Sequence, residues 1–75
     1  MNMKLSKLKR GQSGIIKGID ENCKIRERLW DMGLVDGTKV TMLHSAPFFG
    51  PLEIVLRGYR LVLRREDADC VEVRI

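Results

Sequence analysis

The stretch CKIRERLWDMGLVDGTKV, residues 23–40, decides the fold, because it combines a short amphipathic helix, two glycine turns and the start of a strand. Ile25, Leu29 and Met32 are spaced i, i+4 and i+7, so they share one side of a helix. Gly33 follows at the position where a residue with left-handed backbone ends a helix. The sequence therefore predicts one short helix that buries an apolar stripe and stops at Gly33.

The residues around this helix favour its two ends. Asn22 is expected to cap the N-terminus, with the acidic pair at 20–21 near the positive end of the helix dipole. Leu34 would close the C-terminus by a hydrophobic contact, and the Asp-Gly pair at 36–37 predicts a tight turn. One helix is thus inserted into a chain whose remaining pattern is typical of β-structure.

Five strands are expected outside the helix. They are segments 12–19, 38–45 and 52–57, the hairpin partner of 52–57, and segment 70–75. The first alternates around Ile15, Lys17 and Ile19, the second places Val40 and Met42 on one face, and the last points Val71, Val73 and Ile75 inward.

The hairpin is predicted from Gly58-Tyr59, because a two-residue type II′ turn prefers glycine at its first central position. This register places aliphatic pairs on one face, which must be the core, and mixed pairs on the other. The inner pairs are Leu56 with Leu61 and Ile54 with Leu63, and the outer pairs are Arg57 with Arg60, Val55 with Val62, and Glu53 with Arg64.

Five short strands and one helix, with a helical or 3-10 turn at 65–68, are typical of a small, strongly bent β-barrel of the SH3-like kind. The fold class is therefore mainly β. The 75 residues form one domain, 1–75, and a domain of this size buries only about 60% of its unfolded surface. No apolar run approaches the roughly 20 residues of a membrane helix, and the basic residues of segment 4–10 interrupt any apolar core of the signal-peptide type. We therefore expect a cytoplasmic protein.

Charge is unevenly distributed along the chain. The formal net charge is +4, and all of the excess lies in residues 1–19, which carry five basic residues and no acidic one. We interpret these residues as a solvated strand and arm, which also suits contact with an acidic surface. Cys23 and Cys70 are the only cysteines, and in the cytoplasm we expect them to be small buried apolar residues rather than a disulfide.

The sequence does not indicate an enzyme. It has no phosphate-binding Gly-x-x-x-x-Gly-Lys loop and no nucleophile signature near His44, the single histidine. His44 is at most a weak metal ligand, because no second ligand has metal-binding spacing, and period 2 from Met42 predicts that it is satisfied at the barrel end. No cofactor is expected.

Protein binding is the function that the surface residues favour. Val55 and Val62 face outward in the predicted hairpin, the loop 46–51 holds its aromatic residues between two prolines, and such apolar groups with an arginine rim resemble an interface. Pairing of two copies would use the same surface. The candidate partner-binding residues are Trp30, Leu43, Phe48, Phe49, Val55, Val62, Arg57 and Arg60. Nucleic-acid binding through Arg57, Arg60 and Arg64 is an alternative, but no aromatic residues alternate with these arginines as base stacking needs.

Several motifs together resemble the FeoA family of small ferrous iron transport proteins. They cover nearly the whole chain, and their order and spacing carry the resemblance. They are Leu5-x-x-Leu8-x-x-Gly11-Gln12-x-Gly14-x-Ile16, Arg28-Leu29-x-x-Met32-Gly33-Leu34-x-x-Gly37-Thr38-x-Val40, Pro51-Leu52, Gly58-Tyr59-x-Leu61-x-Leu63-Arg64, and Ala68 followed by Val71-x-Val73.

The resemblance implies an SH3-like domain that works beside a membrane ferrous iron permease with a cytoplasmic G-protein domain. A related domain ends some metal-dependent repressors, but this chain has no helix-turn-helix region and is more similar to the free-standing protein. The implied function is a non-enzymatic accessory of iron uptake, at the inner membrane through its partner and without inserting into the bilayer. A small metal-binding chaperone or sensor is the alternative.

Overall fold

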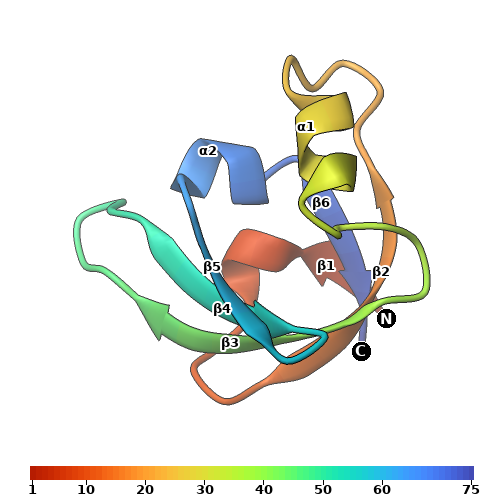
Figure 1. Ribbon diagram of the computed structural model, residues 1–75. Helices are drawn as coiled ribbons and strands as arrows, with labels where there is room; N and C mark the ends of the chain where they lie inside the picture. Colours follow the sequence, from red (N-terminus) through yellow and green to blue (C-terminus); the bar gives the residue numbers. More distant parts are fainter.

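Six antiparallel strands form one sheet in the spatial order β1-β6-β2-β3-β4-β5. The computed structural model describes all residues, 1–75. In Figure 1 the sheet bends round a central 3-10 helix, η1, and the helices α1 and α2 lie across its open side. The elements are β1 (Asn2–Lys4), η1 (Leu5–Lys7), β2 (Ser13–Ile19), α1 (Arg26–Asp31), β3 (Lys39–Ser45), β4 (Leu52–Leu56), β5 (Tyr59–Leu63), α2 (Arg65–Ala68) and β6 (Val71–Arg74).

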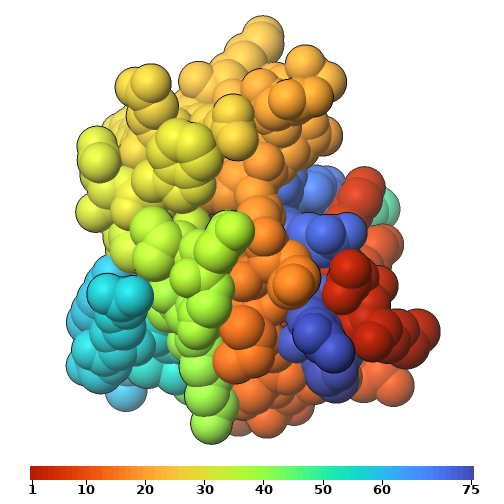
Figure 2. All heavy atoms as spheres, turned by 90° about the vertical axis from the view of Figure 1, so that its right-hand side faces the viewer, coloured from red at the N-terminus to blue at the C-terminus, as the bar shows by residue number.

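The strand β1 is the one that the sequence pattern missed. It has three residues and pairs with β6, so that Met3 lies opposite Val73. The first residues of the chain consequently lie beside the last ones (Figure 2). A strand this short has no alternation to detect, and it forms because β6 offers an open edge. The five basic side chains of residues 1–19 are all exposed, as predicted.

The C-terminal end of α1 confirms the prediction from Gly33. Gly33 has φ of 102°, its N–H donates to the Trp30 carbonyl at 2.9 Å, and the Leu34 N–H donates to the Leu29 carbonyl at 3.1 Å. These two bonds are the Schellman arrangement that satisfies the last carbonyls of a helix. Leu29 is completely buried, and Ile25 and Met32 pack against the core.

The predicted cap at the other end of α1 is wrong. The helix begins at Arg26, its N-cap is Ile25, and no side chain caps it. Asn22 lies in the preceding loop, where its backbone N–H donates to Asp20 Oδ1 at 2.9 Å. Asp20 therefore stabilises a local turn, a role that its short acidic side chain fills as readily as helix capping.

Two bulges correct the predicted strand faces. The register of β2 against β6 shifts between Ile16 and Gly18, so Ile16 and Ile19 are buried while Ile15 is exposed. The register of β3 against β4 shifts between Met42 and His44. A bulge adds one residue to one strand and changes which side chains face the core. His44 is exposed as a result, and the prediction that it is satisfied at the barrel end is wrong.

The hairpin register is also corrected, by two residues. Leu56 pairs with Tyr59, so the two central turn residues are Arg57 and Gly58, with φ of 48° and 84°. Positive φ at both positions is typical of a type I′ turn rather than the predicted type II′. A two-residue shift keeps every side chain on its predicted face, but it changes the neighbours. Glu53 lies opposite Val62 rather than Arg64.

The core lies between the curved sheet and the helices. Val40, Met42, Val71 and Val73 are buried as predicted, but Ile75 is 51% exposed, because the last strand ends at Arg74. Both cysteines are free and half-buried, and they pack against the core. The fifteen buried apolar residues are Leu5, Leu8, Ile16, Ile19, Leu29, Leu34, Val40, Met42, Leu52, Ile54, Leu56, Leu63, Ala68, Val71 and Val73.

Candidate protein-docking surface

The outer face of β3, β4 and β5 carries the apolar residues that the sequence singled out. Val55 lies between Thr41 on β3 and Arg60 on β5, and it is half-buried by these neighbours. Val62, on the edge strand β5, is 66% exposed. The corrected register makes the two valines diagonal neighbours, which are still within reach of one binding partner.

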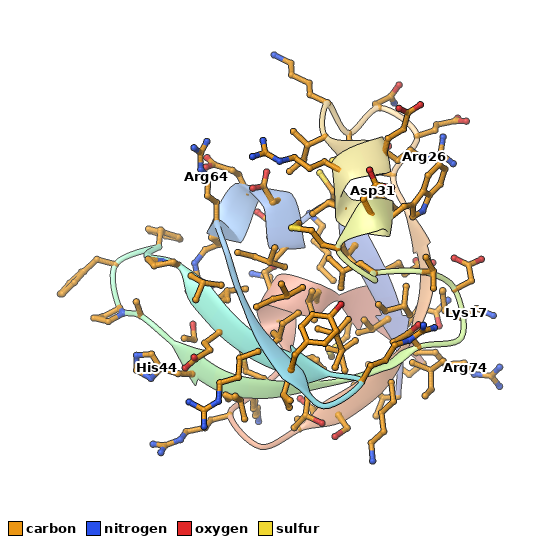
Figure 3. All side chains as sticks on the ribbon, in the orientation of Figure 1. Lys17, Arg26, Asp31, His44, Arg64 and Arg74 are labelled. Atoms are coloured by element: carbon orange, nitrogen blue, oxygen red, sulfur yellow. The ribbon has the colours of Figure 1, made fainter.

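The bulge in β3 adds a further apolar side chain to this region. Because the register shifts between Met42 and His44, Leu43 and His44 together oppose Glu53. Leu43 is half-buried, and His44 is exposed at the sheet's lower left (Figure 3). Glu53 lies opposite Val62 on β5. Glu53 thus has Leu43 and His44 as neighbours on one side and Val62 on the other.

The β3–β4 loop, residues 46–51, projects two aromatic side chains from the end of this face. Two hydrogen bonds close it, from the Ala46 N–H to the Pro51 carbonyl at 3.0 Å and from the Gly50 N–H to the Pro47 carbonyl at 3.1 Å. In Figure 1 the loop is at the left of the molecule, on the opposite side from the two termini. At its tip Phe48 is 95% exposed and Phe49 is 87% exposed.

The backbone of the tip is strained. Phe48 has φ of 57° and Phe49 has φ of 62°, a region that bulky side chains rarely occupy. Each such residue costs about 1–3 kcal/mol, and this kind of strain is concentrated at functional sites. Neither phenyl ring gains burial that would offset the cost within the chain. Strain without internal compensation is the expected property of a tip that gains its contacts from another molecule.

Arg65, the first residue of α2, fixes the loop to the body of the domain. Its Nη2 donates to Ser45 Oγ at 2.7 Å and to the Ala46 carbonyl at 3.2 Å. Hydrogen bonds from a charged donor are stronger than neutral ones, so this side chain holds the start of the loop firmly. The start of the loop that carries the two phenylalanines is therefore fixed before binding, which lowers the entropy cost of binding.

The three other arginines near this surface differ in whether their side chains are bound within the domain. Arg60 and Arg64 are exposed, and Arg64 points away from the body of the domain in Figure 3. Arg57 is turned toward Thr38, the residue before β3, and its Nη2 donates to Thr38 Oγ1 at 3.1 Å. Arg60 and Arg64 thus remain available for an acidic partner, while Arg57 contributes to the fold of the hairpin.

Trp30 lies apart from the other predicted binding residues. It is on α1, with 38% of its surface exposed, and the Arg26 guanidinium is 4.5 Å from its ring centroid. α1 and the β3–β4 loop occupy different ends of the molecule in Figure 1. The structure therefore places Leu43, Val55 and Val62 on neighbouring strands and Phe48 and Phe49 in the loop at the end of those strands. We call these five residues the docking surface, and Trp30 lies outside it.

Sequence reasoning did not single out Ile15. It is exposed on the outer face of β2, where it lies opposite Lys39 on β3 and Arg74 on β6. The pattern misplaced it because the bulge after Ile16 is not visible in the order of apolar and polar residues. The glycine at 18 was the available signal, since glycine within a strand often marks a bulge.

The titratable groups form no metal centre. No three side chains of His, Cys, Asp or Glu converge on one position. His44 has Glu53 as its nearest neighbour across the sheet, and no third ligand completes a site. Neither α1 nor α2 has the length and apolar character that crossing a bilayer requires.

Comparison with known proteins identifies the family. Residues 3–75 match the family described as the FeoA domain. A curated relative from Porphyromonas gingivalis, the Fe(2+) transport protein A/Fe(2+) transporter FeoB fusion protein, is 34% identical over 73 residues. That alignment covers 97% of this chain but only 9% of the relative, so the chain spans a small part of that protein's length.

Solved structures agree in fold. The FeoA-like protein from Clostridium acetobutylicum superposes with a TM-score of 0.89 and 31% identity, covering 99% of this chain and 86% of that one. FeoA of Stenotrophomonas maltophilia, described as an SH3 domain protein and solved with zinc, gives a TM-score of 0.82 and 31% identity, covering 95% and 88%. Because the family match extends over nearly the whole chain and the barrel superposes on these structures, the chain belongs to the FeoA family and has its SH3-like fold.

Proposed function

We propose that this chain is a non-enzymatic accessory protein of ferrous iron uptake, which docks through its docking surface on the cytoplasmic G-protein part of a ferrous iron permease. The observation that carries the proposal is the relative whose single chain joins an iron transport protein A to the transporter FeoB. Two functions joined in one chain are kept close together, which is what an accessory protein gains from docking.

The shape of the surface supports this role. Val62 and the two phenylalanines at the loop tip are apolar side chains that water now surrounds. Covering apolar area gains about 25 cal/mol per Å², so these side chains favour a binding partner with a complementary groove. Arg65 already holds the start of the strained loop. The entropy cost of ordering the loop when a partner binds would therefore be small.

The charge of the chain supports an acidic partner. The net charge is +4, and Arg60 and Arg64 extend into solvent beside the apolar surface. Charges at the rim of an interface act mainly on the rate of association and on its salt dependence. We therefore expect an acidic region on the permease domain, a binding rate that falls with ionic strength, and a cytoplasmic location at the membrane through that partner.

The experiment that tests the proposal is chemical-shift mapping of the labelled protein in three separate titrations. The titrants are the permease's cytoplasmic domain, ferrous iron without oxygen, and a short single-stranded DNA. Shifts centred on Val62 and the loop tip with the permease domain are expected. Silence with that domain contradicts docking. Broadening around His44 with iron, or shifts at the arginines with DNA, would then support a metal-binding or nucleic-acid-binding function instead.

A further inference from the structure

Two cysteines from distant parts of the chain meet beside the core. Cys23 lies in the loop that leads into α1, and Cys70 immediately precedes β6. The backbone of Asp20 connects both segments. Its N–H donates to the Cys70 carbonyl at 2.8 Å, and its carbonyl accepts from the Cys23 N–H at 3.0 Å. The fold thus positions the two residues through the same short stretch of main chain.

The Cys23 thiol also acts on Cys70. The pKa of the Cys70 thiol is raised from 9.0 to about 12, chiefly by burial, next by the nearby Cys23 thiol, and less by the carboxylates of Asp20 and Asp67. Cys70 Sγ is also 3.6 Å from the Glu66 carbonyl oxygen, to which it donates. Cys70 therefore keeps its proton at neutral pH.

Both cysteines lie partly at the surface. Each cysteine is half-buried and free. Cys70 borders a surface hollow of about 560 Å³ next to Asp20 and Glu72, and Cys23 borders a second hollow beside α1. A small reagent can enter either hollow without unfolding the barrel. This access separates the pair from inert cysteines in a closed core.

We propose that Cys23 and Cys70 form a reversible intramolecular disulfide by exchange with a low-molecular-weight disulfide such as glutathione disulfide. Cytosolic disulfides of this kind are transient and respond to the redox state of the cell. The linked residues would tie the loop before α1 to the start of β6. This modification site is independent of the docking surface and of the function proposed above.

The exchange proceeds in two balanced steps. The Cys23 sulfur, after losing its proton, attacks one sulfur of glutathione disulfide, and the glutathione thiolate that leaves takes up a proton. The Cys70 sulfur, after losing its proton, then attacks Cys23 Sγ in the mixed disulfide and releases the second glutathione, which takes up that proton. Two protein thiols are oxidised, one glutathione disulfide is reduced to two thiols, and no other reactant is needed.

Cys23 is the attacking residue, because the Cys70 thiol is held in its protonated form. The first step also prepares the second. Once Cys23 is in a mixed disulfide, it carries no negative charge and no hydrogen to share, so two of the causes that raise the pKa of Cys70 disappear. Cys70 then loses its proton more readily and completes the exchange.

To test this proposal, the folded protein is equilibrated with buffers that contain an increasing ratio of glutathione disulfide to reduced glutathione. Unreacted thiols are then blocked by alkylation, and tryptic peptides are analysed by mass spectrometry. Trypsin would release Cys23 in peptide 18–24 and Cys70 in peptide 66–74. We expect these two peptides to appear joined by a disulfide, within one chain, and to separate again when the buffer is made reducing.

Two matched variants test the order of the steps. In Cys70→Ser the mixed disulfide of Cys23 with glutathione should accumulate, because the residue that removes it is missing. In Cys23→Ser much less glutathione should attach to Cys70. The proposal is overturned if the wild-type peptides join only in denaturant, if the disulfide links two separate chains, or if Cys23 and Cys70 take up glutathione equally and stay unlinked.

Discussion

The Tyr59 hydroxyl donates a hydrogen bond to the carbonyl oxygen of Met32, and so joins the β4–β5 hairpin to the end of α1. The bond forms where α1 turns into Gly33, and a Cβ at Gly33 would clash with the tyrosine oxygen. The conformation of one glycine and the position of one hydroxyl are therefore coupled. This contact closes the open side of the barrel between elements that are distant in sequence.

Replacing Tyr59 with Phe should lower the free energy of unfolding by about 0.5–1.5 kcal/mol, the usual contribution of one hydrogen bond. The ring and its packing are retained, so only the bond to the Met32 carbonyl is lost. Urea denaturation followed by circular dichroism measures the change. A midpoint identical to that of the wild type would show that the contact does not stabilise the closed barrel.

Gly33→Ala should be more destabilising than Tyr59→Phe. The left-handed backbone costs a residue with a Cβ about 1–2 kcal/mol, and the added methyl would also displace the Tyr59 hydroxyl. Gly11→Ala is a matched control, since Gly11 has φ of 82° but open space around its Cβ position. We expect Gly33→Ala to lose more stability than Gly11→Ala in the same urea titration. Equal losses would mean that backbone strain alone is responsible.

Relieving the strain at the loop tip should stabilise the protein, whereas the two substitutions above destabilise it. Phe48→Asn should raise the free energy of unfolding by up to about 1 kcal/mol, because asparagine tolerates positive φ and the exposed phenyl ring contributes no burial. Phe48→Ala, which removes the ring but keeps the strained backbone, should show no such gain. Both variants should bind the permease domain more weakly. If Phe48→Asn were more stable than the wild type but bound the permease domain equally well, the strain at the loop tip would have no role in docking.

Because the pKa of Cys70 is raised, the free energy of unfolding should change with pH in the alkaline range. Since the folded pKa of about 12 lies above the ordinary thiol value of 9.0, the folded state holds this proton more tightly than the unfolded chain. The stabilisation is complete below pH 9 and is lost as the pH rises toward 12. Under reducing conditions, unfolding free energies of wild type and Cys70→Ser should approach each other across that interval. Parallel curves would show that Cys70 does not contribute.

Local rules predicted the parts of the fold that depend on neighbouring residues. Gly33 ends α1 as expected, because helix termination requires only a few residues in sequence. The faces of the hairpin were also predicted correctly, since alternation survives a shift of two residues. The register itself was not, because Arg57 takes a positive φ that its residue type does not favour.

Features that depend on tertiary contacts could not be predicted from the order of apolar and polar residues in the sequence. β1 exists because β6 is beside it, and the bulges that expose Ile15 and His44 are responses of the strands to barrel curvature. The exposure of Val62, Phe48 and Phe49 was predicted, from the outward face of the hairpin and the loop between two prolines. The separation of Trp30 from the docking surface and the meeting of Cys23 with Cys70 depend on how the helices lie across the sheet.

The most direct test of the docking account is the affinity of the permease's cytoplasmic domain for Val62→Glu, measured by isothermal titration calorimetry. Ile75→Glu is the matched control, because it places the same charge on an exposed apolar residue that directly follows β6, in the other half of the strand order. A central apolar contact contributes more than about 1 kcal/mol, so we predict that Val62→Glu weakens binding by at least about fivefold while Ile75→Glu binds like the wild type. Equal affinities for all three proteins, with Val62→Glu folded, would contradict the account.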